Sequence, residues 1–129
     1  MIGINYLYTS DHNNALYYYT KALNLRISEL RKADTKNNIS QIYTDKENHH
    51  QVIKILSPLT VQKEVLNNPE SLSRIIDNLG YSYFKVGDSR AFDYLNQSLK
   101  IRTQEKDEWG LISSYYHLSE FYKKSNINL

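Results

Sequence analysis

The 129-residue chain contains no cysteine, which excludes disulfide bonds and any metal site built on thiolates. Proline occurs only twice and glycine four times, so long helices can form with few interruptions. Apolar residues never run for the roughly 20 positions that a membrane-spanning helix needs, and the N-terminus has no signal-peptide pattern. We therefore expect a soluble segment without membrane contact, and we favour the cytoplasm over the periplasm.

Charge of one sign is not clustered anywhere, and the formal net charge is only +2, which argues against a nucleic-acid-binding surface. Hydrophobic residues make up 40% of the chain and charged residues 23%, a balance typical of a folded domain. Tyrosine is abundant, with 12 residues, and its apolar ring with a polar tip suits half-buried seams between helices. We interpret Tyr17, Tyr18 and Tyr19 as such packing residues rather than as a base-stacking platform.

Apolar residues recur at helical spacing along most of the chain. Asn68 followed by Pro69 marks a helix start, Gly87 marks a helix end, and Pro58 should end or kink the helix before it. The pattern predicts a helix over about residues 12–32 and a helix pair over about 35–57, with its first helix near 34–48 and its second near 49–59. It also predicts helices over 69–86, 88–104 and 108–125, with short helices over 1–8 and 60–66.

A five-residue pattern repeats along the chain: an apolar residue, a small residue directly after it, and a tyrosine four positions after the apolar one. It occurs at Ile2-Gly3…Tyr6, Ile39-Ser40…Tyr43, Leu79-Gly80…Tyr83 and Leu118-Ser119…Tyr122, with spacings of 37, 40 and 39 residues. A second amphipathic segment follows each of the first three. The small residue lets the two helices of a unit approach closely, so the repeat predicts stacked helix–turn–helix units.

The units "IGINYLYTSDHNNALYYYTKALNL" and "LGYSYFKVGDSRAFDYLNQSLKI" resemble the tetratricopeptide repeat (TPR). This resemblance implies an all-α fold, in which helix–turn–helix repeats stack as a right-handed superhelix, or α-α solenoid. One array would cover residues 1–129, with repeats near 1–33, 34–67 and 68–106 and an incomplete repeat over 107–129. The middle unit departs from the pattern, because Ser40, Val52 and Pro58-Leu59 replace its expected residues.

The segments "SLKIRTQEKDEWGLISSYYHLSEFYKKSN" and "IKILSPL…NPESLSRIIDNLGYSYFK" are similar to the longer-period TPR arrays of bacterial signalling and regulatory proteins, including those of Bacteroidetes. The resemblance implies a non-catalytic interaction or sensor module that is a fragment of a longer protein. Its partner would be a peptide or a protein domain, including its own output domain, held in the concave groove.

The groove of such an array is lined by the first helix of each repeat. Here it should carry polar side chains of both charge signs together with aromatic anchors. Some TPR domains clamp the C-terminal carboxylate of a chaperone in this groove. We do not expect such a site, because Ile4 and Asn78 stand where it would need an asparagine and a basic residue. The groove candidates are Asn38, Gln41, Arg74, Asp77, Asn78, Tyr81, Lys85, Tyr116, His117, Glu120 and Lys124.

Residues that could suggest catalysis or metal binding have simpler interpretations. His49 and His50 are adjacent, so they point in different directions, and no third ligand follows at suitable spacing. We interpret them, like His12, as polar residues of inter-helix turns. Asp77 and Glu120 belong to different repeats, and no phosphate loop or nucleophile elbow occurs. We expect no enzymatic activity, no metal and no cofactor.

Two other functions remain open at this point. The chain could be a structural scaffold whose groove is empty, or an RNA-binding helical repeat, although a basic stripe for RNA is missing.

The final helix should direct Leu111, Tyr115, Leu118, Phe121 and Tyr122 inward. Because its partner helix is missing, part of this face would be bare, and we expect a weak homodimer through a terminal helix.

Overall fold

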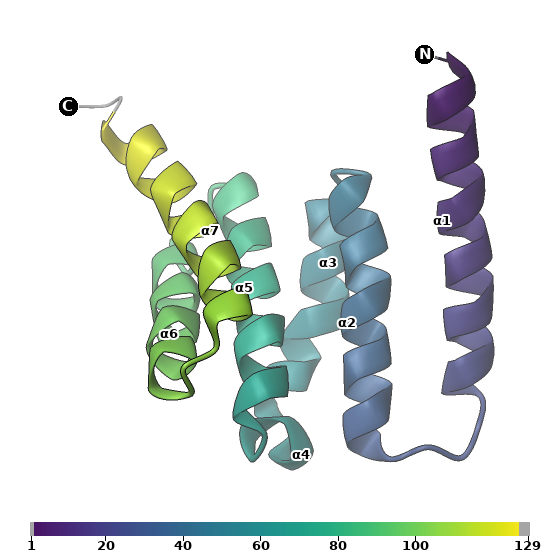
Figure 1. Ribbon diagram of the computed structural model, residues 1–129, viewed down its shortest axis with the longest axis horizontal. Coiled ribbons are helices and arrows are strands. Elements are labelled where there is room, and N and C mark those ends of the chain that lie inside the picture. Colours follow the sequence, from purple (N-terminus) through teal and green to yellow (C-terminus); the bar gives the residue numbers. More distant parts are fainter. Residues whose placement is uncertain (1, 127–129) are drawn as a thin grey trace.

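The computed structural model describes the backbone of residues 2–126 and the side chains of residues 11–125. Regular structure in this range is entirely helical (Figure 1), which confirms the all-α prediction. The elements are α1 (Ile2–Leu23), α2 (Glu29–Asp45), α3 (His49–Leu56), the 3₁₀ helix η1 (Ser57–Val61), α4 (Lys63–Leu66), α5 (Pro69–Lys85), α6 (Ala91–Gln104) and α7 (Glu108–Asn126).

The helices follow one another across the molecule in chain order, from α1 on one side to α6 and α7 on the other (Figure 1). Each helix packs mainly on its neighbours in sequence: α1 on α2, α2 on α3, α3 on α5, α5 on α6, and α6 on α7. In addition, α5 contacts α2 and α7. As a result α2, α5 and α7 are brought together, as expected for the first helices of successive units.

Three helices begin at side chains that accept a backbone hydrogen bond, which satisfies amides that the first turn leaves free. Ser28 caps α2, Asn48 caps α3 and Asn68 caps α5, each accepting from the backbone N–H three residues later. The predicted start at Asn68 and Pro69 is therefore confirmed. Pro58 is the second residue of η1, which begins directly after α3 ends at Leu56. The predicted end of this helix agrees with the lack of a backbone N–H in proline.

Helices α2, α5 and α6 end in the same type of turn. One residue takes a left-handed conformation, with φ of 59° at Glu47, 76° at Gly87 and 55° at Lys106. The next backbone N–H then bonds back to the helix: Asn48 N to Tyr43 O at 2.8 Å, Asp88 N to Tyr83 O at 2.8 Å, and Asp107 N to Arg102 O at 2.9 Å. This is the geometry of a Schellman motif, and it reverses the chain within a few residues.

The predicted turn between residues 8 and 12 is wrong, because α1 is one continuous helix and the first unit is not a helical hairpin. No residue between Thr9 and His12 is a glycine or a proline, so no residue there breaks the helix. The helix expected over 12–32 ends at Leu23, and α2 begins at Glu29 because Ser28 provides a cap. His12 therefore lies inside a helix and not in a turn.

The start of α6 also differs from the prediction, since the helix begins at Ala91 and not at residue 88. Asp88 Oδ1 accepts a hydrogen bond from Arg90 N at 2.9 Å, which holds residues 88–90 in a turn ahead of the helix. Asp88 also pairs with the Arg90 side chain at 2.8 Å. The carboxylate thus stabilises the turn and does not cap α6 directly.

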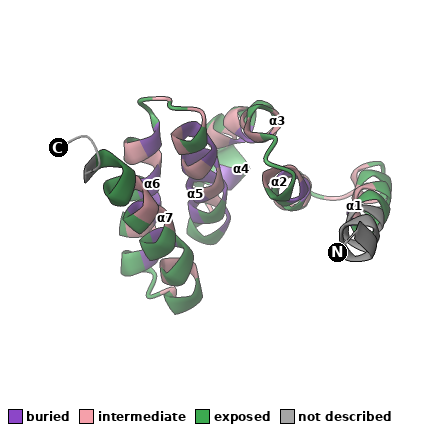
Figure 2. Ribbon diagram, turned by 90° about the horizontal axis from the view of Figure 1, so that it is seen from above, coloured by how far each residue is buried: buried purple, intermediate pink, exposed green. Residues whose placement is uncertain are grey.

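The core lies between α3, α5 and α6, where buried residues are concentrated (Figure 2). It includes Leu56, Leu79 and Leu95, which are fully buried. Gly80 lies at the crossing of α5 and α6, and a Cβ at this position would be 3.0 Å from both Leu95 N and Leu95 Cγ. The close approach of the two helices thus depends on a residue without a side chain.

Two of the five residues expected to face inward on α7 do not: Tyr115 is 58% exposed and Tyr122 is 51% exposed. Their equivalents 39 residues earlier in the repeat, Ile76 and Tyr83, are buried, because α6 packs against α5. No described helix covers the same face of α7. The apolar spacing therefore predicted the helix correctly, but two of the aromatic side chains that it assigned to the interior lie on the surface.

Candidate functional site

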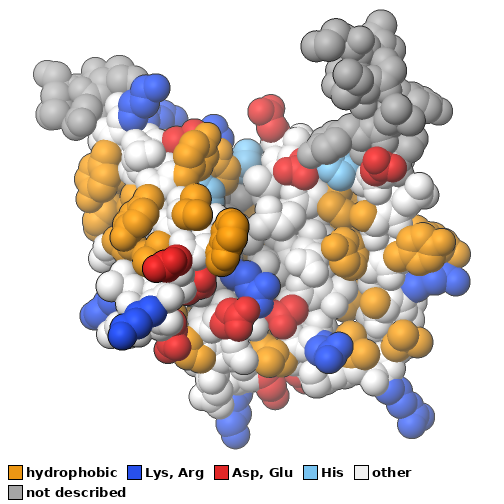
Figure 3. Space-filling model, viewed as in Figure 1, with side chains coloured by type: hydrophobic (Ala, Val, Ile, Leu, Met, Phe, Trp, Pro, Cys, Tyr) orange, Lys and Arg blue, Asp and Glu red, His pale blue; other side chains and the backbone are white. Residues whose placement is uncertain are grey.

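Five of the eleven groove candidates line one pocket of about 340 Å³: Asn38, Gln41, Arg74, Asp77 and Asn78. The pocket lies between α2, α5 and the start of α7, and Arg102 reaches it from α6. Its other lining residues are Asn37, Glu70, Arg102, Asp107, Trp109, Gly110 and Ser113. Figure 3 shows charged side chains of both signs gathered near the middle of this face, close to hydrophobic ones.

A buried ion pair forms part of the pocket wall. Asp77 is 1% exposed and Arg102 is 4% exposed, and Arg102 Nη1 lies 3.2 Å from Asp77 Oδ2. The same nitrogen donates to Ser114 Oγ at 2.9 Å, and His117 Nδ1 lies 2.9 Å from Asp77 Oδ2. The cluster joins α5, α6 and α7, so it fixes the end of the pocket that these helices form.

Hydrogen bonds hold some pocket residues and leave others accessible. Asn78 Nδ2 donates to Asn37 Oδ1 at 2.9 Å and links α5 to α2. Arg74 is exposed, and within the described part of the chain it pairs only with Glu70, at 3.4 Å, a contact worth little in water. Asn38 and Gln41 are exposed as well. These three side chains can therefore turn toward a ligand without breaking the protein interior.

Another group of the predicted residues forms an aromatic cluster rather than part of the pocket. Tyr81 stacks on His117 with a centroid separation of 4.3 Å. Burial raises the pKa of Tyr81 to about 12, with repulsion from Glu120 and a hydrogen bond to it as further causes. A hydrogen bond to Glu120 also raises the pKa of Tyr116. Both phenols are therefore protonated near neutral pH and act as hydrogen-bond donors.

The two predicted lysines stand over aromatic rings. Lys85 Nζ is 5.6 Å from the Tyr81 ring centre, and Lys124 Nζ is 5.4 Å from that of Phe84. Such cation–π contacts stabilise exposed positions modestly. The structure thus places these lysines beside the aromatic cluster and outside the pocket.

The histidines are placed differently from one another. His12 is buried and lies 3.2 Å from Asp45 Oδ2, joining α1 to α2. His49 is half-buried in the first turn of α3, with Nδ1 3.3 Å from Ser82 Oγ, and burial followed by repulsion from Lys85 lowers its pKa. His50 is exposed beside it. Within the described side chains, no group of three His, Cys, Asp or Glu could hold a metal ion.

The sequence did not single out Arg102, Asp107, Trp109 or Gly110 as site residues. A local signal did point to Asp107, because an aspartate directly before a helix can cap it by accepting a backbone amide of the first turn. Asp107 Oδ1 accepts from Gly110 N at 2.9 Å. Trp109 is the single tryptophan and is 85% exposed, which is unusual for a large apolar side chain. The burial of Arg102 depends on the packing of three helices and has no local signal.

Comparisons with known proteins give no identification. No family model matches the chain, and neither a curated protein nor a solved structure matches it. The TPR assignment therefore remains a prediction that depends on the repeated residues. None of the helices in the described range is both long and apolar enough to cross a membrane.

Proposed function

We propose that the protein is a non-catalytic interaction module of a bacterial regulatory protein, and that it binds an extended peptide segment of its partner in the pocket between α2, α5 and α7. The observation that supports this proposal most directly is the pocket itself. It combines exposed amide side chains, an exposed guanidinium and an exposed indole with a wall that is internally paired.

Each part of the pocket matches a requirement of peptide binding. The amides of Asn38 and Gln41 can both donate to and accept from a peptide main chain. Tryptophan and arginine are the residue types that contribute most to binding energy at protein interfaces, and here Trp109 and Arg74 are accessible. The Asp77–Arg102 pair keeps the wall in place before binding, which reduces the entropy lost in the complex.

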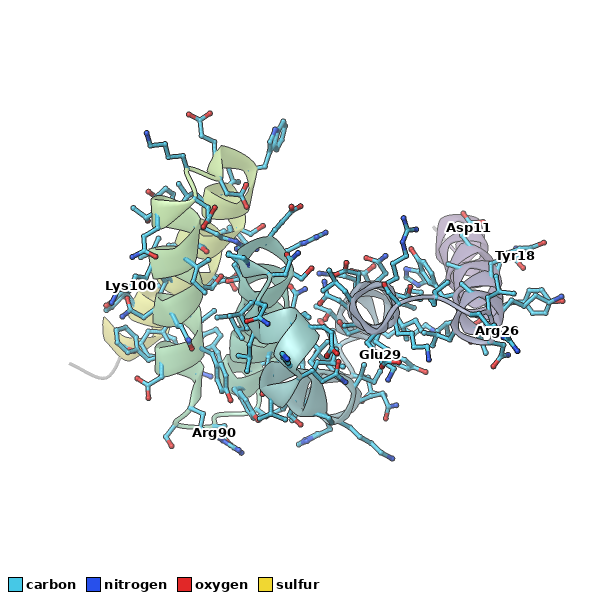
Figure 4. The ribbon with its side chains drawn as sticks, turned by 90° about the horizontal axis from the view of Figure 1, so that it is seen from below. Asp11, Tyr18, Arg26, Glu29, Arg90 and Lys100 are labelled. Carbon is cyan, nitrogen blue, oxygen red and sulfur yellow. The ribbon has the colours of Figure 1, made fainter. Side chains whose placement is uncertain are left out.

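The test is selection of binding peptides from a displayed random library with the purified protein. Peptides that are enriched should bind the wild type, and Arg74→Ala should weaken their binding about tenfold or more, because the change removes a charged contact. Lys100→Ala is the matched control, since Lys100 lies on α6 on the side away from α2 (Figure 4) and does not line the pocket.

Amide chemical shifts measured by NMR during the titration would locate the peptide. Changes should concentrate at Asn38, Gln41, Arg74, Asn78 and the Trp109 indole. A library that yields no binder, or binders that are unaffected by Arg74→Ala and shift residues elsewhere, would reject the pocket as the interaction site.

Self-association is the second candidate function, and a separate observation favours it. The bare stripe of α7 consists of Ile112, Tyr115 and Tyr122, which are 61%, 58% and 51% exposed. Contiguous apolar residues of this kind mark association sites, and the same face of α5 is covered by α6. A twofold contact between two such stripes would be self-complementary.

We expect light scattering at rising concentration to show a weak dimer, because the stripe is small compared with stable interfaces. Tyr115→Lys should abolish the dimer by placing a charge in the contact. Tyr18→Lys is the comparison, since Tyr18 is exposed on α1 and points away from the other helices (Figure 4). A monomer up to hundreds of micromolar would reject self-association, and a dimer lost only with Tyr18→Lys would assign the contact to α1.

A further inference from the structure

The pocket carries an excess of negative charge. Its lining includes three carboxylates, those of Glu70, Asp77 and Asp107, and two guanidinium groups, those of Arg74 and Arg102. Each guanidinium has a carboxylate partner: Arg102 pairs with Asp77 in the buried wall, and the exposed Arg74 lies 3.4 Å from Glu70. Asp107 has no ion pair in the part of the chain that the structure describes. One negative charge therefore remains available to a ligand.

The backbone fixes the position of this remaining carboxylate. Asp107 Oδ1 accepts from Gly110 N at 2.9 Å, so the side chain is held at the first turn of α7. Asp107 Oδ2 and Arg102 Nε both lie close to the point where a Cβ of residue 110 would stand, and either would clash with it. Because Gly110 has no Cβ, Oδ2 keeps its place in the pocket wall.

A second and independent feature is a buried acceptor without a donor. Asp77 is 1% exposed, it lines the pocket, and its Oδ1 has no hydrogen-bond partner among the residues that the structure describes. An unsatisfied carboxylate oxygen inside a protein costs free energy, which a ligand donor can recover. Arg102 Nε, in a residue that is 4% exposed, similarly lacks an acceptor.

Trp109 adds a surface suited to a cation. Its side chain is 85% exposed and lines the same pocket, and an indole face attracts a guanidinium or ammonium group within about 6 Å of its centre. We infer that the pocket selects a basic side chain, arginine or lysine, of the bound peptide, with Asp107 and Trp109 as the groups that recognise it. This inference depends on the proposed function and specifies its ligand.

The experiment uses three synthetic peptides that differ at one position: acetyl-Gly-Ser-Arg-Ser-Gly-amide and its counterparts with citrulline or glutamate. Citrulline has nearly the shape of arginine without its charge. Trp109 is the single tryptophan, so its fluorescence reports binding at the pocket directly. We expect the arginine peptide to bind at least tenfold more tightly than the citrulline peptide, and this preference to shrink as salt is added.

Variants separate recognition from folding. Asp107→Asn retains an oxygen that can accept from Gly110 N but removes the charge, so it should abolish the preference for arginine over citrulline while the protein stays folded. Asp93→Asn is the matched control, because Asp93 is an exposed carboxylate on α6 outside the pocket. Circular dichroism confirms that both variants are folded.

Each outcome bears on the inference in a defined way. Equal affinity for the arginine and citrulline peptides, or tighter binding of the glutamate peptide, overturns the basic-residue preference and leaves the proposed function intact. A preference that survives Asp107→Asn overturns the role of that carboxylate. If neither these peptides nor any library peptide binds, both the inference and the proposed function are wrong.

Discussion

Replacement of Arg102 by methionine is expected to lower the free energy of unfolding by about 3–5 kcal/mol, because it leaves the buried carboxylate of Asp77 without its partner. Asp77 is almost completely buried, and Arg102 Nη1, at 3.2 Å, is its only arginine or lysine contact within the described residues. Methionine retains most of the apolar stem of arginine, so the loss reports the ion pair and the hydrogen bond to Ser114 rather than a cavity. Urea denaturation measures the change.

The control for this prediction is Arg74→Met. Arg74 makes an ion pair with Glu70 at 3.4 Å, but both side chains are largely exposed, and such pairs contribute roughly 0–1 kcal/mol. The double change Asp77→Leu with Arg102→Met should recover much of the lost stability, since apolar replacement of a whole buried pair is often neutral. If Arg102→Met is no less stable than Arg74→Met, the buried pair does not hold α5, α6 and α7 together.

Gly80→Leu is expected to destabilise the protein by about 1–3 kcal/mol or more, because it inserts a side chain where two helices already touch. A Cβ at residue 80 would be 3.0 Å from Leu95 N, which is backbone and cannot rotate away. Helices α5 and α6 would have to separate, and the packing of Leu79 and Tyr83 would loosen with them. The melting temperature and urea unfolding would both record the loss.

The internal repeat supplies a matched control for this change. Ser119 in α7 is the repeat equivalent of Gly80 in α5, 39 residues later in the sequence. It is exposed, and no described helix packs across it. Ser119→Leu should therefore change stability by less than about 0.5 kcal/mol. An unchanged melting temperature for Gly80→Leu, or an equal loss for both variants, would show that the α5–α6 contact is not limited by residue size. Ser40→Ala should be tolerated, although it removes the hydrogen bond from Ser40 Oγ to Asn37 O.

Features that depend on neighbouring residues could be predicted from the sequence. The start of α5 follows from Asn68 and Pro69, its end follows from Gly87, and the importance of Gly80 follows from the repeated small residue. In each case the physical cause, a cap, a left-handed turn or a close approach, acts within one or two turns of helix. A single sequence contains the information needed for such contacts.

Features that depend on competition between local signals, or on several helices, could not be predicted. The continuity of α1 was missed because the residues between the two predicted helices, 9–11, are polar like those of a turn, yet none of them prevents the helix from continuing. The pocket was predicted only in part, because the positions of Arg102 and Trp109 depend on how α6 and α7 pack on α5. A partly bare face of α7 was predicted, but which of its side chains are exposed could not be, since Tyr115 and Tyr122 have the spacing of a buried stripe.

The attachment of α1 has a consequence for the dynamics of the chain. This helix packs mainly on α2, and among its side chains from Asp11 to Leu23 only His12 is buried. Local opening costs least where few apolar contacts are lost. The part of α1 from Asp11 to Leu23 can therefore separate from α2 while α3, α5 and α6 stay folded, so that the facing surface of α2 is exposed intermittently even in the native protein.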